Sequence, residues 1–480
     1  MSTEGDALGK VMSRLVCRGC GTEVASATLY PFRCPNADGD DVDHVLRRHF
    51  AADPTNGSET ILSPEDLNPF VRYRRLLHSY CAARQNGLAD QRWVEIAREL
   101  NDAVRSVDGI GFRETPLTSV PAMAERLGVG EVWVKDESGN VSGSHKGRHL
   151  MGVMLWLKTA QELGLAPDEL PPLAIASCGN AALAAAVVAR AAQRRLEVFV
   201  PTHANELVLE RLAGLEAHLH ACPRQNDETG DPCYLRFREA LSGGALPFTC
   251  QGNENGLTLD GGKTLAWEMV TALAGEGRTI DRLFLHVGGG ALAASVIEGL
   301  REACEIGALS RMPRVHAVQT KGAYPLVRAY KTLSDRVFER WGEATGRVAP
   351  ESPVERSALL ADPDLRPFVS AGLDTAVARR SEFMWPWEEE PQSIADGILD
   401  DETYDWLAVV EGMLETSGWP LIVSEDLLRQ ANRLARETTG LTPCHTGTAG
   451  LAGALACRGE LDQSETVALL VTGVERGSAG

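Results

Sequence analysis

Apolar runs typical of β-strands alternate with Ala- and Leu-rich helical stretches from Glu131 to the C-terminal region. The strand-like runs lie at 131–135, 173–177, 196–200, 218–222, 246–250, 282–287, 314–319 and 466–471, and the helical stretches include 146–163, 181–194, 206–217, 262–275 and 291–304. Such alternation predicts parallel sheets that are covered by helices on both faces. This many strands favours two α/β lobes over a single sheet.

Length and composition complete the expected architecture. A chain of 480 residues with 44% hydrophobic and 24% charged residues is globular and too long for one ordinary domain. We predict a small Cys-containing appendage at 1–50, a small lobe at 120–250, and a large lobe built from 51–119 and 251–480. Residues 331–390 are charged and Pro-punctuated, which indicates a surface insertion with one aromatic anchor; a lid or an oligomer contact is the alternative.

Charge and cysteine content exclude several classes of protein. The 66 acidic residues outnumber the 47 basic ones, and the formal net charge of −19 opposes binding to nucleic acid or to anionic lipid. The stretch 171–189 is uncharged but carries Ser177, Gly179 and Asn180, which lipid would leave unpaired. Residues 1–13 lack an apolar signal core, and eleven cysteines form no disulfide framework. We therefore expect a cytoplasmic enzyme that binds neither nucleic acid nor a membrane.

Two segments with polar side chains follow predicted strands and open predicted helices. Lys146 ends a glycine-containing loop and lies in the first helical turn, where the helix dipole disfavours a cation unless an anion is bound. Ser177, Cys178, Gly179 and Asn180 lie at the carboxyl end of the next strand, where α/β proteins bind ligands. The alternatives are a solvated surface lysine and an ordinary helix N-cap at Asn180.

Two further segments end strands in the second half of the chain. Gly288, Gly289 and Gly290 enter a helix and can direct backbone amides toward a phosphate. Thr472 ends the last strand and presents a hydroxyl at the same edge if the sheet is parallel.

In this order, the four segments resemble those of the fold type II pyridoxal-phosphate (PLP) enzymes, the tryptophan synthase β-like superfamily. The nearest resemblance is to threonine synthase and to the threonine dehydratases. Further matches are Thr115-Pro-Leu117, Val134-Lys-Asp-Glu137, Gly261-Gly-Lys-Thr264 and the segment 393–398. The resemblance runs from residue 110 to 480, except for 331–390. It implies a two-lobed α/β fold with parallel sheets, and PLP as the cofactor.

The resemblance also assigns a role to each candidate residue. Lys146 would form the internal aldimine and then act as general base and acid. Thr472 would face the pyridine nitrogen, and its neutral hydroxyl would favour elimination and replacement over transamination. The other implied cofactor-binding residues are His145, Asn180, Gly288, Gly289, Gly290, Ala291 and Leu292. The implied substrate-binding residues are Ser177, Cys178 and Gly179 for the carboxylate and Arg148, Lys263 and Thr264 for a second anion.

Departures from the threonine synthase pattern leave the substrate open. His145 and Gly147 stand where that pattern has Phe and Asp, and the glycine loop resembles that of a dehydratase. We predict a homodimeric PLP-dependent lyase, threonine-synthase-like, that acts at the β- or γ-carbon of a small amino acid. The alternatives are a serine/threonine ammonia-lyase, a β-replacement synthase of specialised metabolism and, from another class, a non-catalytic PLP-binding regulatory protein.

The appendage contains Cys17, Cys20 and Cys34, and it resembles the zinc-ribbon-like start of some threonine synthases. Tetrahedral zinc needs four ligands. A second Cys-x-x-Cys would end at Ala37, so His44 or Asp38 would have to supply the fourth ligand. The alternative is a degenerate knuckle that is held by packing alone.

Overall fold

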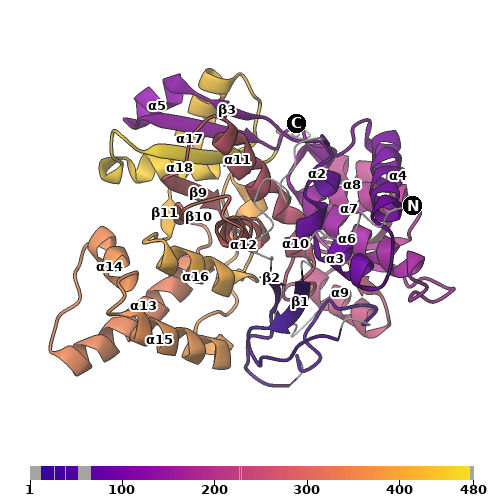
Figure 1. Cartoon of the computed structure of the whole chain (residues 1–480), viewed down its shortest axis with the longest axis horizontal. Helices are drawn as coiled ribbons and strands as arrows, with labels where there is room; N and C mark the ends of the chain where they lie inside the picture. Colours follow the sequence, from indigo (N-terminus) through magenta and orange to yellow (C-terminus); the bar gives the residue numbers. More distant parts are fainter. Residues whose placement is uncertain are drawn as a thin grey trace, which may run out of the picture.

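The computed structural model describes residues 12–25, 28–37, 39–51, 66–225, 228 and 230–475. Two sheets of mainly parallel strands form its core, and helices cover them (Figure 1). The predicted α/β architecture of two lobes with a small N-terminal appendage is therefore confirmed.

The larger sheet has six strands in the order β11-β10-β9-β12-β4-β3. They are β11 (Leu421–Val423), β10 (Arg314–Thr320), β9 (Arg282–His286), β12 (Thr466–Val471), β4 (Glu131–Asp136) and β3 (Leu117–Ser119). All neighbours are parallel except β3, which pairs antiparallel with β4. Helix α18 (Ala449–Ala456) packs on β9, β10 and β11, and α16 (Trp406–Glu415) packs on β10 (Figure 1).

The smaller sheet has four parallel strands in the order β7-β6-β5-β8. They are β7 (His218–Ala221), β6 (Leu196–Val200), β5 (Leu173–Ala176) and β8 (Leu246–Pro247). The helices of this lobe are α6 (Lys146–Glu162), α7 (Asn180–Ala191), α8 (Glu206–Gly214) and α9 (Pro232–Ser242).

One boundary between the predicted lobes needs correction. The strand Glu131–Asp136 falls inside the predicted small lobe, 120–250, yet it pairs with β12 along its whole length and so belongs to the larger sheet. The sequence shows that this segment is a strand but not which sheet accepts it. The remaining boundaries of the lobes stay predictions.

The N-terminal appendage is an antiparallel ribbon of β1 (Met12–Cys17) and β2 (Leu46–Ala51). Arg47 pairs with Glu411 of α16, and Arg48 pairs with Asp260 of α10 (Thr258–Gly262) and Glu302 of α12 (Ala291–Glu305). Helices α2 (Pro69–Arg72), α3 (His78–Gln85) and α4 (Asp90–Asp108) follow the ribbon in the chain. Through Arg47 and Arg48, the ribbon thus joins helices α10, α12 and α16, which are far apart in the chain.

The predicted insertion is an ordered helical unit. It comprises α13 (Pro325–Thr345), α14 (Pro353–Leu360) and α15 (Arg366–Ala378), and it projects at the lower left of Figure 1. Its aromatic anchor is a stack in which the Arg328 guanidinium lies 3.7 Å from the centroid of the Trp385 ring. This cation–π contact ties the end of the insertion to the start of α13.

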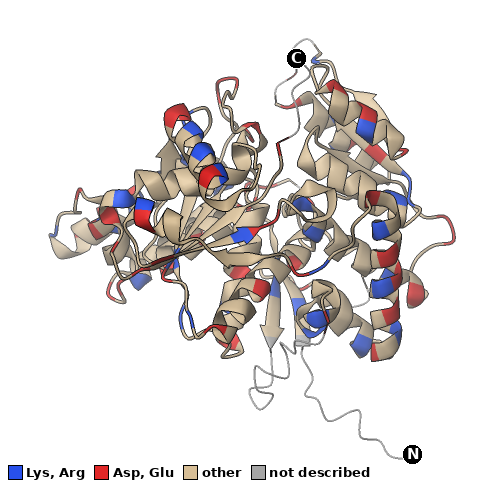
Figure 2. Ribbon diagram, turned by 90° about the horizontal axis from the view of Figure 1, so that it is seen from above, with Lys and Arg blue, Asp and Glu red and all other residues tan. Residues whose placement is uncertain are grey.

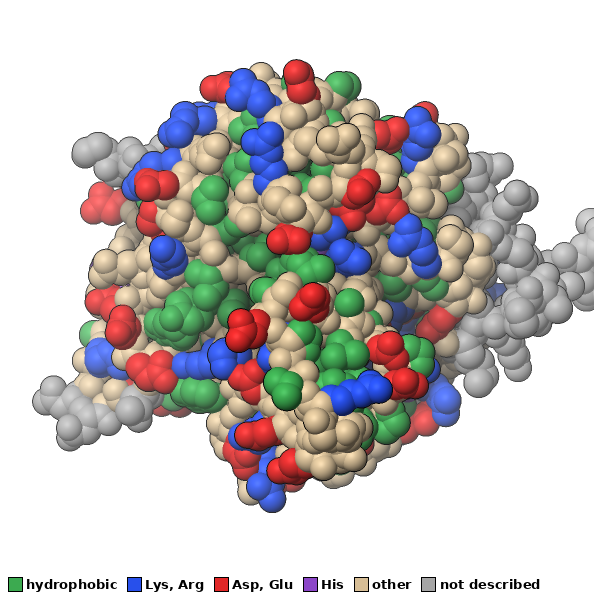
Figure 3. Space-filling model, turned by 90° about the vertical axis from the view of Figure 1, so that its left-hand side faces the viewer, with side chains coloured by type: hydrophobic (Ala, Val, Ile, Leu, Met, Phe, Trp, Pro, Cys, Tyr) green, Lys and Arg blue, Asp and Glu red, His purple; other side chains and the backbone are tan. Residues whose placement is uncertain are grey.

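Acidic and basic residues are interspersed on the surface of the chain. Figure 2 shows red and blue residues side by side on the outer helices, and Figure 3 shows the same mixture on the left-hand side of the molecule. On α4, for example, Arg92 pairs with Glu95, Glu99 and Glu162. Within the described ranges, no helix is long and apolar enough to cross a bilayer.

A close contact between α6 and α10 gives a test of the fold. A β-carbon at Gly152 would lie 2.7 Å from the backbone nitrogen of Gly261, so Gly152→Val should lower the free energy of unfolding by about 1–3 kcal/mol through overpacking. The measurement is urea denaturation. Gly214→Ala is the control, because nothing lies within 4 Å of that position; equal stability of the two variants would contradict the contact.

Candidate active site

The loop that carries Lys146 joins β4 to α6. Lys146 is the first residue of α6, as the sequence predicts. Ser144 forms an isolated β-bridge with Gly473, and the Val474 amide donates to the Gly143 carbonyl at 3.3 Å. The segment that follows β12 therefore holds the lysine loop in place.

A buried network of four charges includes Arg148, which lies two residues after Lys146 on α6. The Arg148 Nε donates to Glu137 at 2.7 Å and its Nη1 donates to Glu268 at 2.6 Å, while Lys135 Nζ also lies 2.6 Å from Glu268. The Thr115 hydroxyl donates to Glu137. All of these side chains are buried, and two cations balance two carboxylates. Burial alone would raise the pKa of Glu137, but Arg148 outweighs it, so the pKa falls from 4.5 to about 2.

Three residues that were predicted to bind a second substrate anion are engaged inside the protein. All three guanidinium nitrogens of Arg148 donate to internal oxygens, including the Thr264 hydroxyl at 3.0 Å. The Lys263 ammonium lies 2.9 Å from Glu302 and 3.1 Å from Glu298. Thr264 donates its hydroxyl hydrogen to the Gly261 carbonyl at 2.7 Å. These contacts give the three residues a structural task.

The segment Ser177 to Asn180 lies at the carboxyl end of β5, at the opening of α7. Gly179 is the N-cap residue and Asn180 is the first helical residue, and all four residues are partly exposed. A β-carbon at Gly473 would lie 3.3 Å from the Asn180 side-chain nitrogen and 3.1 Å from the Cys444 sulfur. Asn180 of the smaller lobe thus reaches the end of β12, as the candidate site requires.

The three glycines connect β9 to α12. Gly290 adopts a φ of 99° and is the N-cap residue of α12, a backbone conformation that suits glycine. A β-carbon at Gly289 would lie 3.0 Å from the Tyr404 ring, and one at Gly290 would lie 3.1 Å from the Asp405 side chain. The Asp405 amide donates to the Gly289 carbonyl at 2.9 Å. The glycines are therefore also needed because the segment 398–405 packs against them.

Thr472 has a partner that sequence reasoning missed. Its hydroxyl oxygen lies 2.9 Å from Nε2 of His286, and both side chains are buried. The rings of His145 and His286 lie 6.2 Å apart, and those of His145 and His149 lie 5.7 Å apart. Burial lowers the pKa of His286 to about 3 and that of His145 well below its usual value, and the positive charge of Lys146 lowers both further. These imidazoles are therefore neutral. The sign of this partner in the sequence was a polar residue, His286, directly before Val287 and the glycines.

Two carboxyl groups near Lys146 were also missed. Burial raises the pKa of Asp400 to about 6 and that of Asp405 to about 7, and the Lys146 ammonium opposes both shifts. Strongly raised carboxyl pKa values beside a lysine are typical of functional sites. In the sequence, these two carboxyl groups were indicated only by an acidic run that follows the segment 393–398.

The side chains around Lys146 fit a polar ligand. Among the described residues, several buried polar atoms have no hydrogen-bond partner: both ring nitrogens of His145, the Ser144 hydroxyl, Nδ1 of His286 and one oxygen of Asp405. Buried polar atoms normally have a partner, so a set of them points to a bound group. Together with a lysine and a glycine loop at a helix N-terminus, they suit an aldehyde that carries a ring and a phosphate.

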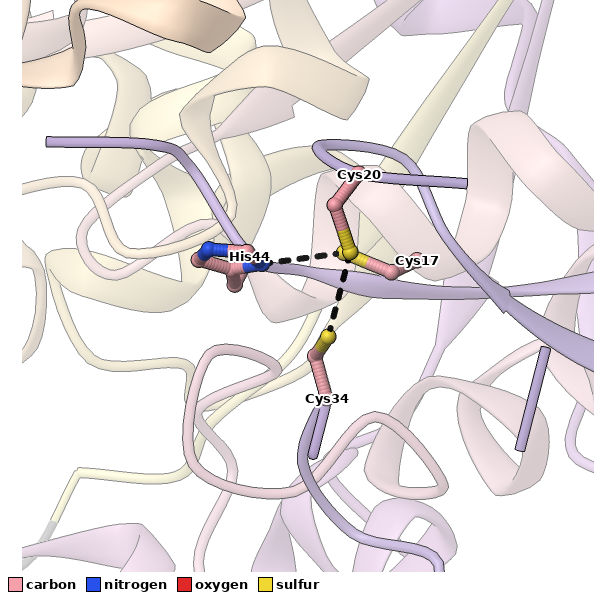
Figure 4. A group of neighbouring side chains, drawn as sticks. All are labelled: Cys17, Cys20, Cys34 and His44. Carbon is pink, nitrogen blue, oxygen red and sulfur yellow. Dashed lines mark hydrogen bonds between the residues drawn. The ribbon is translucent and has the colours of Figure 1, made fainter. Parts of the chain in front are cut away.

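A second cluster lies in the N-terminal ribbon. One possible ligand atom from each of Cys17, Cys20, Cys34 and His44 lies within 4.8 Å of the other three (Figure 4). The Cys17 sulfur is 3.4 Å from His44 Nδ1, and the sulfurs of Cys20 and Cys34 are 3.5 Å apart. His44 therefore stands in the fourth ligand position, while Asp38 lies outside the described residues.

Comparison with known proteins gives a family match. The model of a family described as "Pyridoxal-phosphate dependent enzyme" matches residues 110–473. The chain is 28% identical over 226 residues to the threonine synthase of Methanosarcina acetivorans, covering 45% of this chain and 50% of that protein. It is 30% identical over 215 residues to the threonine synthase of Synechocystis sp., covering 45% and 52%. The chain thus spans about half the length of the curated relatives that it matches.

Solved structures share the fold. The processed form of threonine deaminase isoform 2 from Solanum lycopersicum has a TM-score of 0.54 at 15% identity, with 81% of this chain and 91% of that chain covered. Diaminopropionate ammonia lyase from Escherichia coli has a TM-score of 0.52 at 16% identity, with 80% and 89% covered.

The network behind Lys146 should dominate local stability. Arg148→Met leaves Glu137 and Glu268 with Lys135 as their remaining cation, which should cost about 3–5 kcal/mol in the free energy of unfolding at pH 7. Because the folded pKa of Glu137 is depressed to about 2, its contribution is present above pH 4.5 and is lost as the pH falls toward 2. The variant should lack that part of the acid dependence.

Urea denaturation at a series of pH values measures both effects. The exposed Arg433 of α17 (Glu425–Thr439) provides the control, since Arg433→Met should change stability by no more than about 0.5 kcal/mol. If Arg148→Met is as stable as Arg433→Met, the network does not hold the start of α6.

Proposed function

The chain belongs to the pyridoxal-phosphate dependent enzymes, and from that premise we propose that it is a lyase acting at the β- or γ-carbon of a small amino acid. One observation carries the proposal. Lys146 and the glycine loop follow parallel strands at the same edge of the larger sheet, and Asn180 approaches the end of β12 at Thr472 and Gly473. Retention of this set argues against the alternative of a non-catalytic PLP-binding protein.

When bound, PLP supplies an electron sink conjugated to the α-carbon of the substrate. In our proposal, Lys146 binds the cofactor covalently and later carries a proton between the substrate carbons. Amides of Gly288 to Leu292 and the ring of His145 hold the phosphate, and Asn180 meets the ring hydroxyl. Ser177, Cys178 and Gly179 receive the substrate carboxylate, which they suit because they are partly exposed beside a helix N-terminus.

Thr472 is proposed to face the pyridine nitrogen. Its hydroxyl bonds to His286, whose depressed pKa keeps the imidazole neutral. Neither group is a carboxylate, so neither holds that nitrogen protonated. The weaker electron withdrawal that results favours elimination and replacement over transamination.

The leading substrate hypothesis is a threonine-synthase-like reaction, which the curated relatives support. A serine/threonine ammonia-lyase is the second candidate. It is favoured by the internal ion pairs of Arg148 and Lys263, because a phosphorylated substrate would need cations that are free to bind it. We accordingly propose that Arg148, Lys263 and Thr264 support the site and do not touch the substrate.

We also propose that the protein is cytoplasmic and forms a homodimer. All eleven cysteines are free thiols, which suits the reducing cytoplasm. The homodimer expected from the sequence can be tested by light scattering.

We further propose that Cys17, Cys20, Cys34 and His44 bind zinc. Three sulfurs and one imidazole nitrogen are a common tetrahedral zinc set. Asp40 accepts from Nε2 of His44 at 3.1 Å, which leaves Nδ1 facing Cys17, and the Asn36 amide donates to the Cys34 sulfur at 3.4 Å. Such outer contacts orient zinc ligands. The metal would stiffen the ribbon whose strand β2 presents Arg47 and Arg48 to helices α16, α10 and α12.

Lys146 provides the test of the main function. The purified protein should absorb as a lysine-bound cofactor, and borohydride should fix that cofactor to Lys146. Lys146→Ala should remove the absorbance, while the circular dichroism spectrum stays unchanged. Turnover of serine, threonine and their O-phospho and O-acetyl esters would then be followed by mass spectrometry. A Lys146→Ala protein that is still yellow and still fixed by borohydride would falsify the assignment.

Metal analysis provides the test of the ribbon. The purified chain should contain one zinc per chain, and both His44→Ala and Cys20→Ser should lower that content and the melting temperature. Cys304→Ser is the matched control, because this free cysteine lies on α12 outside the cluster. Full zinc content in His44→Ala, or none in the wild type, would rule out the four-ligand site.

A further inference from the structure

The glycine loop is covered by an acidic side chain from a distant segment. A methyl group at Gly288 would collide with the Asp400 carboxylate and would lie 2.9 Å from the Ile398 Cα atom. A β-carbon at Gly289 would also lie 3.7 Å from the carboxyl carbon of Asp400. The Asp400 carboxylate therefore lies against the first two glycines of the loop, whose amides the cofactor phosphate is proposed to use.

An amide cradle at a helix N-terminus selects anions. Within the proposed function, the anion for this cradle is the cofactor phosphate. A carboxylate and a phosphate on adjoining amides of a low-dielectric site repel each other strongly. The two anions cannot share the loop unless one of them loses its charge or moves away.

The charged groups around Asp400 favour loss of its charge. Burial raises its pKa first, the carboxylates of Asp401 and Asp231 raise it further, and the Lys146 ammonium and the Gly289 amide lower it. The resulting pKa is about 6 before any phosphate is present. Across the loop, the pKa of Asp405 is also raised, and that of Tyr404 lies well above its ordinary value. A bound phosphate adds one more negative group to this set.

We propose that Asp400 is an internal stand-in for the cofactor phosphate, and that it takes up one proton from solvent when the phosphate binds. The inference rests on the proposed function. The proton converts the carboxylate of Asp400 to a neutral carboxylic acid. Its O–H can donate to a phosphate oxygen, and the Gly289 amide becomes available to the phosphate. Asp400 is thus a positioning residue of the cradle.

The sign of the pH dependence follows from linkage. Phosphate binding raises the pKa of Asp400, so the bound state holds more protons than the free state above the free-state pKa of about 6. Cofactor affinity should therefore fall as the pH rises, by up to roughly ten-fold per pH unit from this group. Below pH 6, Asp400 is already protonated in the free chain and contributes no further change.

The experiment uses pyridoxine 5'-phosphate on the full-length chain after its own cofactor has been removed. This ligand lacks the aldehyde, so its binding does not report on the amine of Lys146. Calorimetry between pH 5.5 and 8.5, in buffers of different ionisation enthalpy, gives both the Kd and the number of protons taken up. At pH 8 the wild type should take up close to one more proton than Asp400→Asn, which should bind roughly ten- to a hundred-fold more tightly.

Asp401→Asn is the matched control. Asp401 is the next residue, and its side chain accepts from the Glu402 amide at 2.9 Å and from the Tyr404 hydroxyl at 3.3 Å. Because the Asp401 carboxylate raises the pKa of Asp400, Asp401→Asn should move the start of the pH dependence to lower pH and keep the slope of the wild type. The ligand's own phosphate titrates alike in every variant. Asp400→Ser is a second variant that also removes the carboxylate, in case Asp400→Asn does not fold.

Two results would overturn the inference alone: equal pH slopes for wild type and Asp400→Asn, or weaker binding by both Asp400 variants. The first would mean that Asp400 leaves the cradle as an anion, and the second that it holds the phosphate in some other way. If the wild type binds neither pyridoxine 5'-phosphate nor PLP, the proposed function fails together with the inference.

Discussion

The position of Lys146 depends on a charge network that lies two residues further along the same helix. Arg148 joins Glu137 at the end of β4 to Glu268 on α11 (Thr264–Gly275), and Lys135 completes the balance. Burying four charges is tolerable only when each has a partner in good geometry. The network therefore fixes α6 against the larger sheet, although α6 itself packs with the helices of the smaller lobe. The first turn of α6, which Lys146 opens, is held in place because Arg148 is anchored in this network.

Parallel strands explain why distant segments converge on that lysine. β9, β12 and β4 run in the same direction, so His286, Thr472 and the loop before Lys146 all lie at one edge of the larger sheet. The carboxyl end of β5 brings Asn180 from the smaller sheet to the same place. Small residues allow the approach, since a β-carbon at Gly473 would already touch both Asn180 and Cys444. The site is thus a consequence of topology, with glycines at the points of closest contact.

Much of this arrangement could be predicted from periodicity and punctuation. The strands Leu196–Val200 and Thr466–Val471 begin and end where the sequence predicts, because both are predominantly apolar and each follows a charged residue. Other elements gave no such signal. β3 and β11 have three residues each, too short for a period to be seen. The helices α14 and α15 were interpreted as a Pro-punctuated surface segment, although Pro353 and Pro367 lie in first turns, where proline favours a helix.

The residues that sequence reasoning missed are those whose partners lie far along the chain. Nothing near Arg148 reveals that Glu268 will neutralise it, and nothing near Asp400 reveals that it will meet Gly289. Both facts change the electrostatic reading of the site. The cations that sequence motifs assigned to an anionic substrate are already paired, while Asp400 and Asp405 face Lys146 with pKa values of about 6 and 7. The net charge beside the lysine therefore changes across the neutral range. With the cofactor bound and Asp400 neutral, discrimination between anionic and neutral substrates should follow the charge of Asp405, because ionisation of that carboxylate adds repulsion for a second phosphate in a buried site.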